Sequence, residues 1–224
     1  MKKVVLFDLD DTLVSEDSYI RSGYRAVCDY LNHAFREYEF NESHLYELYT
    51  ADAKNVFNRL LEEYDIAYEK EDILKLVQIY RTHMPVISFY DDVLPTLFAM
   101  KKKKVRCGII SDGYLETQSA KVEALHAERY FEKIILTESL GREYWKPHPK
   151  AFELMQEYFA VPFEEMMYVG DNPRKDFLIQ KTYPIYTVRI IREKSVYLNE
   201  AYEEGMKEQK RVTSLTEIIN LLEG

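Results

Sequence analysis

Short runs of apolar residues recur along the chain at intervals that suit the strands of a parallel β-sheet. The first run, residues 4–7, is β-branched and aromatic and ends at Asp8, as expected of a strand buried on both faces. Helix-length segments separate four further runs of this kind, at residues 105–110, 134–137, 166–169 and 185–188. The alternation of strands and helices predicts an α/β fold built on a doubly wound parallel sheet.

A different pattern occupies residues 15–85, where apolar positions recur with the spacing of helices. The positions that show this spacing are Ile20, Val27, Leu31, Ala34, Val56, Leu60, Ile73, Leu76, Val77 and Tyr80. No strand is expected in this stretch, and Pro85 helps to end its last helix. We therefore predict two domains: a core made of residues 1–14 and 86–224, and an all-helical cap domain made of residues 15–85.

Two charged segments of the core change this picture little. Four lysines at residues 101–104 end a helix expected over residues 92–103, and their charge suits the negative end of the helix dipole. Residues 189–211 are polar and charge-rich and precede a final short helix expected at residues 214–222. A loop, an additional helix and an oligomer contact are all open interpretations of that segment.

Composition and charge narrow the class of protein. Hydrophobic residues make up 46% of the 224 residues and charged residues 31%, as in a well-packed soluble protein. The formal net charge of -9 argues against a nucleic-acid binder, because phosphate backbones attract Lys and Arg surfaces. Cys28 and Cys107 lie outside any CxxC motif, so neither a disulfide framework nor a zinc site is expected. With no signal-peptide pattern and no stretch able to span a bilayer, a cytoplasmic protein without membrane contact is expected.

Candidate chemistry begins where the first predicted strand ends, in the sequence Asp8-Leu9-Asp10-Asp11-Thr12. In open α/β sheets ligands bind at the carboxyl edge, where Asp8 and Asp10 would emerge close together. Two neighbouring carboxylates suit a hard cation such as Mg²⁺, and one of them can attack phosphorus as a nucleophile. Acidic residues at such places also serve in plain turns and helix caps, so this motif alone leaves both interpretations open.

Ser111, Asp112 and Gly113 follow the second predicted strand and lead into a helix. A hydroxyl group and free backbone N–H groups at the start of a helix can hold a phosphate. Ser and Asp are also ordinary helix N-caps, and that alternative is equally simple.

A single cation, Lys146, lies in the sequence Trp145-Lys146-Pro147-His148-Pro149. The two prolines stiffen the backbone around it. A rigidly held lysine can neutralise an acidic nucleophile and the oxygens of a transferring phosphoryl group.

Two more carboxylates follow the fourth predicted strand. Asp171 could complete a metal site, and Asp176, expected in the next helix, could orient Lys146 or a metal-bound water. Alternatively, Asp171 and Asn172 are turn residues before a helix that starts at Pro173.

Together the four segments resemble the motifs of the haloacid dehalogenase superfamily of phosphatases, in order and spacing along nearly the whole chain. The matching patterns are DxDx[TV] at residues 8–12, a strand-end Ser at Ser111, a Lys before Pro at Lys146, and GDxxxxD at residues 170–176. The resemblance implies a Rossmann-like catalytic core, and the helical insertion resembles the small cap of this superfamily. Hydrolytic dehalogenases of the same fold lack the second aspartate, so Asp10 favours phosphoryl transfer.

The resemblance also implies residue roles. Asp8 would be the nucleophile and Asp10 the general acid and base, while Ser111 and Lys146 stabilise phosphate and charge. Mg²⁺ would be held by Asp8, by the backbone carbonyl of Asp10 and by Asp171. The other residues expected at the site are Thr12, Asp112 and Gly113, which bind phosphate, and Asp176, in a supporting role.

These residues predict a Mg²⁺-dependent phosphatase that hydrolyses a small phosphorylated metabolite, a sugar phosphate or a nucleoside monophosphate, through an aspartyl-phosphate. A phosphosugar mutase of the same family keeps every motif and is the nearest alternative. A non-catalytic binding protein on this fold is the other alternative, suggested by the tyrosine-rich cap and by residues 189–211. The expected partner is the small metabolite, and the expected oligomeric state is a monomer or a homodimer.

Overall fold

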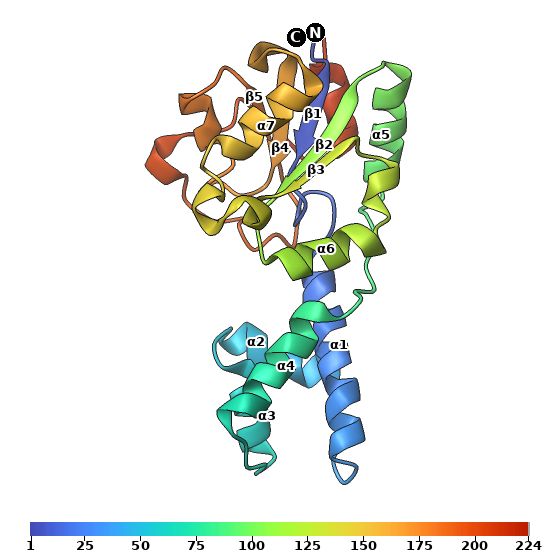
Figure 1. The fold of residues 1–224 in the computed structure, drawn as a ribbon, viewed down its shortest axis with the longest axis vertical. Coiled ribbons are helices and arrows are strands. Elements are labelled where there is room, and N and C mark those ends of the chain that lie inside the picture. Colours follow the sequence, from blue (N-terminus) through green and yellow to red (C-terminus); the bar gives the residue numbers. More distant parts are fainter. Residues whose placement is uncertain (224) are drawn as a thin grey trace. The chain divides into compact units, whose positions relative to one another are not determined.

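The computed structural model describes residues 1–223. Its core is a six-stranded parallel sheet in the order β3-β2-β1-β4-β5-β6 (Figure 1). The strands are β1 (Val4–Phe7), β2 (Arg106–Ser111), β3 (Lys133–Leu136), β4 (Met166–Gly170), β5 (Tyr186–Ile190) and β6 (Lys210–Val212). The predicted α/β class and doubly wound parallel sheet are therefore confirmed, and β6 goes beyond the five strands that the apolar runs predict.

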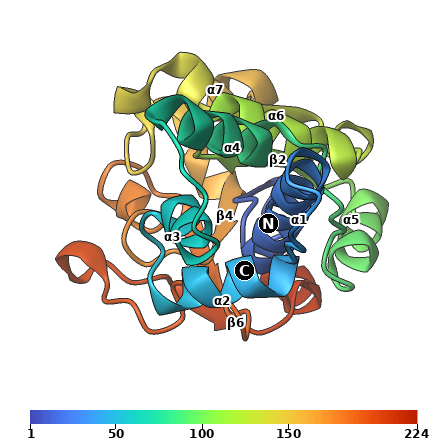
Figure 2. The same ribbon diagram turned by 90° about the horizontal axis from the view of Figure 1, so that it is seen from below.

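Helices cover both faces of this sheet. α7 (Lys150–Phe159) packs on one face, where Phe152 belongs to the same apolar cluster as Leu6, Ile110 and Tyr168. α5 (Val93–Lys102) lies on the other face beside the 3₁₀ helix Leu215–Leu221, as Figures 1 and 2 show together. The final short helix expected from the sequence is therefore a 3₁₀ helix. The remaining helices of the core are α6 (Leu115–Ala124) and short 3₁₀ turns at Ala127–Arg129, Thr137–Leu140, Arg142–Tyr144, Phe163–Glu165, Leu178–Lys181 and Glu203–Gly205.

β1 and β4 are neighbours at the point where the strand order reverses. Phe7 pairs with Val169, and the N–H of Asp8 donates to the carbonyl of Val169 at 2.8 Å. Ser111 is the last residue of β2, which pairs with β1 on its other side. The residues that leave β1, β2 and β4 therefore share one carboxyl edge, the usual ligand site of open α/β sheets.

The helical insertion after β1 has an apolar core of its own. Its helices are α1 (Glu16–Ala34), α2 (Glu42–Ala51), α3 (Val56–Glu63) and α4 (Lys70–Thr82), and none of residues 17–87 is in a strand. All four helices contribute buried side chains to one cluster, Val27, Leu45, Leu60 and Leu76 among them. Residues 17–87 form one compact unit, and residues 1–16 with those from Ser88 onward form the other. Each observed junction lies two residues beyond the one expected from the sequence, at 14/15 and 85/86.

Local sequence signals explain where some of these helices begin. The Asn41 side chain accepts the N–H of His44 at 2.9 Å and caps α2. Glu69 and Asp72 form a reciprocal capping box at the start of α4.

The helix α1 has 19 residues, and no helix within residues 1–223 combines the length and apolar character of a membrane span.

Gly23 lets α1 and α4 approach closely inside the cap. A Cβ atom built on Gly23 would lie 2.5 Å from Cδ2 of Tyr80 and 3.2 Å from Cε1 of His83. The first distance is far below van der Waals contact, so a larger residue requires the Tyr80 ring or the helices themselves to shift.

Gly23→Ala is therefore expected to lower the free energy of unfolding by about 1–3 kcal/mol, because the added methyl group overlaps the Tyr80 ring. Thermal unfolding measures the change, and the loss should shrink in a Tyr80→Ala background, where the ring is absent. At an open helix position the same substitution stabilises by roughly 1 kcal/mol. A Gly23→Ala protein that gains stability would contradict the close packing.

Candidate active site

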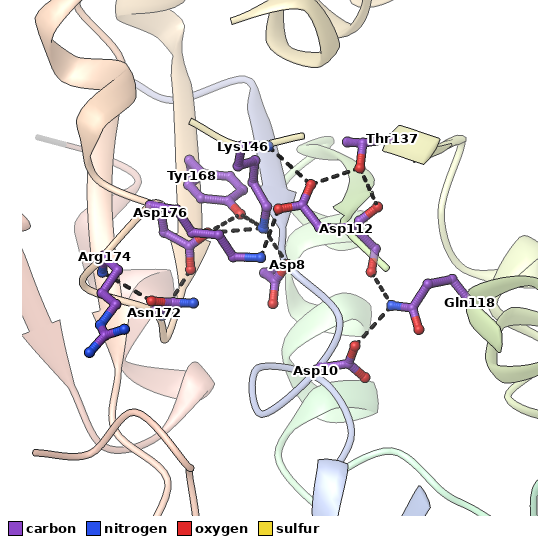
Figure 3. A network of polar contacts seen from close by, with 12 residues as sticks. Asp8, Asp10, Asp112, Gln118, Thr137, Lys146, Tyr168, Asn172, Arg174 and Asp176 are labelled. Atoms are coloured by element: carbon purple, nitrogen blue, oxygen red, sulfur yellow. Dashed lines mark hydrogen bonds and ion pairs between the residues drawn. The ribbon is translucent and has the colours of Figure 1, made fainter. Parts of the chain in front are cut away.

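Lys146 lies at the centre of a buried polar network at the carboxyl edge of the sheet (Figure 3). Its ammonium group forms an ion pair with Asp8 and donates to Asp176 Oδ1 at 2.9 Å and to the Tyr168 hydroxyl at 2.7 Å. The side chain of Lys146 is 0% exposed. Burial by itself lowers the pKa of a lysine, but Asp176 and Asp8 outweigh it, so the pKa of Lys146 lies well above its ordinary value. The network holds a permanent cation against Asp8.

Asp176 is placed by the loop that follows β4. It lies in a turn rather than in the predicted helix, and its Oδ2 accepts the N–H of Asn172 at 2.9 Å. Its Oδ1 accepts from Lys146 and, at 3.0 Å, from Tyr168. Gly170 leaves the necessary room, because a Cβ atom there would lie 2.7 Å from Cγ of Asp176. Both oxygens of Asp176 are engaged within the protein, which favours this residue as the group that orients Lys146.

Asp8, the first residue after β1, is 6% exposed. Burial raises the pKa of Asp8 to about 7, and among its neighbours Lys146 lowers this pKa whereas Asp176 raises it. The charge of Lys146 therefore offsets only part of the free-energy cost of burying the Asp8 carboxylate. A further cation beside Asp8 would favour its ionised form.

Three carboxylates offer oxygens for such a cation. Ligand atoms of Asp8, Asp171 and Asp176 lie within 4.8 Å of one another, and all three residues are buried. Burial, followed by the charges of Asp8 and Asp176, raises the pKa of Asp171 well above its ordinary value. Ser195 Oγ donates to Asp171 Oδ2 at 2.6 Å and so fixes the orientation of this carboxylate. A cluster of buried oxygen donors whose negative charge one lysine compensates only in part fits a hard divalent cation.

Asp10 has different partners from Asp8 (Figure 3). Gln118 Nε2 donates to Asp10 Oδ2 at 2.9 Å, and Lys121 Nζ donates to Asp10 Oδ1 at 2.6 Å. Burial alone would raise the pKa of Asp10, but Lys121 outweighs it, and the pKa lies below its ordinary value. In the metal-free protein the two carboxylates of this loop therefore have pKa values shifted in opposite directions, Asp8 upward and Asp10 downward.

The other two polar residues of this loop serve the backbone. Asp11 has a φ of 49°, and its carboxylate accepts the N–H groups of Glu16 at 3.0 Å and Val196 at 3.2 Å. The Thr12 carbonyl accepts from Arg192 Nη2 at 2.8 Å. The Thr12 side chain is buried, and its hydroxyl has no hydrogen-bond partner in residues 1–223, so a contact with phosphate stays a prediction.

Asp112 joins three segments of the site. Its Oδ1 accepts from Thr137 Oγ1 at 2.7 Å and from the N–H of Lys146 at 3.1 Å, while its Oδ2 accepts from Lys175 Nζ at 2.7 Å. Burial alone would raise the pKa of Asp112, but Lys146 and Lys175 outweigh it and lower this pKa. The carboxylate of Asp112 is thus occupied in fixing the loop of Lys146.

Ser111 and Gly113 lie on either side of Asp112, next to Gln118. Ser111 Oγ accepts from Gln118 Nε2 at 2.5 Å, which leaves the hydroxyl hydrogen of Ser111 available to another acceptor. Gly113 has a φ of 139°, and a Cβ atom there would lie 3.1 Å from the Gln118 side chain. This position therefore favours glycine on both backbone and steric grounds.

The structure also places at the site five residues that the sequence did not single out: Gln118, Lys121, Tyr168, Lys175 and Ser195. Gln118 and Lys121 are buried on α6 together with Val122, at positions where a helix on a sheet normally carries apolar residues. Polar residues on the sheet-facing side of this helix are the sequence signal that could have marked Gln118 and Lys121 as site residues. Ser195 lies within residues 189–211, where no local pattern marks it.

Comparison with known proteins identifies the family. The family model described as haloacid dehalogenase-like hydrolase matches residues 5–190. A glyceraldehyde 3-phosphate phosphatase of Methanopyrus kandleri is 30% identical over 202 residues, covering 87% of this chain and 86% of that protein. The chain belongs to the haloacid dehalogenase-like hydrolases. The predicted family is thus confirmed, and with it the enzyme class of a phosphoric monoester hydrolase.

Solved structures share the fold. A putative β-phosphoglucomutase of Thermotoga maritima superposes with a TM-score of 0.70 at 18% identity, covering 100% of this chain and 99% of that chain. A phosphatase of the same superfamily from Thermococcus onnurineus superposes with a TM-score of 0.62 at 23% identity, with 100% and 99% covered. Both likenesses support the Rossmann-like fold of the core.

Because Lys146 offsets the burial of the Asp8 carboxylate only in part, the free energy of unfolding of the metal-free protein should depend on pH. Burial raises the pKa of Asp8 from 3.8 to about 7, so the folded protein keeps a proton that the unfolded chain releases. The free energy of unfolding contributed by this group therefore falls as the pH rises between those two values. Asp8→Asn, which has no such proton, should therefore change the melting temperature in EDTA more favourably at about pH 8 than at about pH 4, whatever the loss of the Lys146 ion pair costs at both.

Thermal unfolding at both pH values measures this difference. Asp91→Asn, at an exposed position, is the matched control and should shift the melting temperature equally little at both. An equal shift for Asp8→Asn at the two pH values would show that Asp8 carries no raised pKa.

Proposed function

We propose that this chain is a Mg²⁺-dependent phosphatase that transfers the phosphoryl group of a small phosphorylated metabolite to Asp8 and then to water. One observation carries the proposal. Two carboxylates of one loop have separate partners, Asp8 against Lys146 and Asp10 against Gln118 and Lys121. Separate environments allow one group to act as a nucleophile and the other to carry protons.

In the first step a carboxylate oxygen of Asp8 attacks phosphorus and the bond between phosphorus and the ester oxygen breaks. Asp10, which must enter this step in its protonated form, gives that proton to the departing oxygen, which leaves as an alcohol. Lys146, which already pairs with Asp8, reduces the repulsion between the nucleophile and the phosphoryl oxygens. In the second step water attacks the aspartyl-phosphate, Asp10 takes a proton from that water, and Asp8 is restored as phosphate leaves.

The phosphate itself would be held by the loop after β2. Ser111 can donate its hydroxyl hydrogen because its oxygen already accepts from Gln118. The backbone N–H groups near Gly113 add donors at the start of α6. Asp112 supports this loop through its bonds to Thr137 and to the N–H of Lys146.

Asp8, Asp171 and the backbone carbonyl of Asp10 would hold Mg²⁺, with Asp176 reserved for Lys146. The donor set consists of oxygens, as this cation prefers. When bound, the cation would neutralise part of the negative charge of the phosphate and of the acidic cluster.

The substrate class is supported by the relative from Methanopyrus kandleri, a glyceraldehyde 3-phosphate phosphatase. Glyceraldehyde 3-phosphate is therefore the first substrate to test, followed by other sugar phosphates and nucleoside monophosphates. A phosphosugar mutase would use the same residues but return the phosphoryl group to a sugar hydroxyl. Exchange between isomers of a hexose monophosphate, with the bisphosphate added, would reveal that activity.

Phosphate release from this panel should require a divalent cation. Excess EDTA is expected to abolish turnover and added Mg²⁺ to restore it, because buried carboxylates would otherwise face an anionic phosphate. Asp171→Asn should raise the Mg²⁺ concentration needed for half-maximal activity by at least about 10-fold. Undiminished turnover in EDTA would refute the mechanism.

The matched control for Asp171→Asn is Asp91→Asn, which removes one negative charge from an exposed position. It should leave the Mg²⁺ dependence unchanged. Equal effects of the two substitutions would show that only the net charge matters, and Asp171 would lose its proposed role.

A further inference from the structure

Two side chains of α6 bind both carboxylate oxygens of Asp10. Gln118 Nε2 reaches Oδ2 at 2.9 Å and Lys121 Nζ reaches Oδ1 at 2.6 Å. The two residues are three positions apart and so lie on one face of the helix. Figure 3 shows the amide of Gln118 directed at Asp10. A carboxylate bound at both oxygens cannot turn without losing a hydrogen bond.

Burying the charged group of Lys121 costs free energy, and this residue is only 1% exposed. Its ammonium group also donates to Glu16 Oε2 at 2.6 Å, so it bridges the Asp10 loop and the first residue of α1. A buried ion pair is weak evidence for stability, since apolar side chains of similar volume often replace one without loss. Stability alone therefore gives little reason for a lysine at this place.

Gln118 connects Asp10 to the loop proposed to bind phosphate. The same Nε2 donates to Ser111 Oγ at 2.5 Å, and Gln118 is 1% exposed. The absence of a side chain at Gly113 leaves the room that Gln118 occupies. One amide group thus fixes the position of a hydroxyl that would hold the phosphate relative to a carboxylate that would move protons.

We propose that Gln118 and Lys121 are positioning residues that hold the Asp10 carboxylate in place for proton transfer to the leaving-group oxygen, with Glu16 holding Lys121. This inference rests on the function proposed above. Neither residue touches the substrate, and both keep their own protons while Asp10 gives its proton to the departing oxygen. Gln118 and Lys121 should therefore affect the reaction rate only for substrates whose leaving group needs the proton from Asp10.

The test compares two substrates of similar shape, phenyl phosphate and p-nitrophenyl phosphate. Phenolate is the poorer leaving group and needs the proton more. Values of kcat/KM are measured with saturating Mg²⁺ for Gln118→Ala and Lys121→Met, each alone and combined with Asp10→Ala. Ser119→Ala, at an exposed position of the same helix, is the control. Lys121→Arg tests whether another cation at this position rescues activity.

Each single variant should lose about 10–10²-fold in kcat/KM on phenyl phosphate and distinctly less on p-nitrophenyl phosphate. In the Asp10→Ala background the same substitutions should cause almost no further loss, because the group that they position is gone. Ser119→Ala should match the wild type, and Lys121→Arg should recover part of the loss of Lys121→Met.

Equal losses on both substrates, or losses that multiply with that of Asp10→Ala, would assign Gln118 and Lys121 to the fold alone and overturn the inference. Should Lys121→Met fail to fold, Gln118→Ala carries the same comparison. Wild-type protein that releases no phosphate from either aryl substrate or from the metabolite panel would instead overturn the proposed function, and the inference with it. The two failures are thereby distinguishable.

Discussion

The site depends on one interaction, the burial of the Lys146 ammonium group between Asp8 and Asp176. A buried cation costs several kcal/mol unless charge and hydrogen bonds compensate it. Here Asp8, Asp176 and the Tyr168 hydroxyl supply both, although they come from three different segments of the chain. The loops after β1 and β4 must therefore meet the loop of Lys146 for the charge to be tolerated.

Much of the surrounding structure follows from this constraint. Asp176 can reach Lys146 because Gly170 carries no side chain, and Asp112 fixes the backbone of Lys146 from the opposite direction. Asp10 does not pair with Lys146 and forms its ion pair with Lys121 instead. Lys146 thus pairs with Asp8 and Lys121 with Asp10. These separate partners would allow Asp8 to act as the nucleophile while Asp10 carries protons.

The parts of this arrangement that the sequence reveals are those with a local pattern. Strands buried on both faces appear as unbroken apolar runs, and the parallel order of the sheet then places Asp8, Ser111 and Asp171 at one edge. The sequence does not predict β6, because this short edge strand contains exposed Lys210 and Arg211 and so forms no apolar run. The other missed features are tertiary: Gln118 and Lys121 resemble solvent-facing residues until a carboxylate from another segment packs against them, and Ser195 lies in a segment without any periodic pattern.

The most direct test of this account is the location of the phosphoryl group during turnover. Rapid acid quenching of the protein with p-nitrophenyl phosphate and Mg²⁺, followed by peptide mapping, should find a phosphoryl adduct on Asp8. The adduct should be cleaved by hydroxylamine, as an acyl phosphate is, and should be absent from Asp8→Asn protein. An adduct on another residue, or wild-type turnover by the Asp8→Asn protein, would contradict the assignment of Asp8 as the nucleophile.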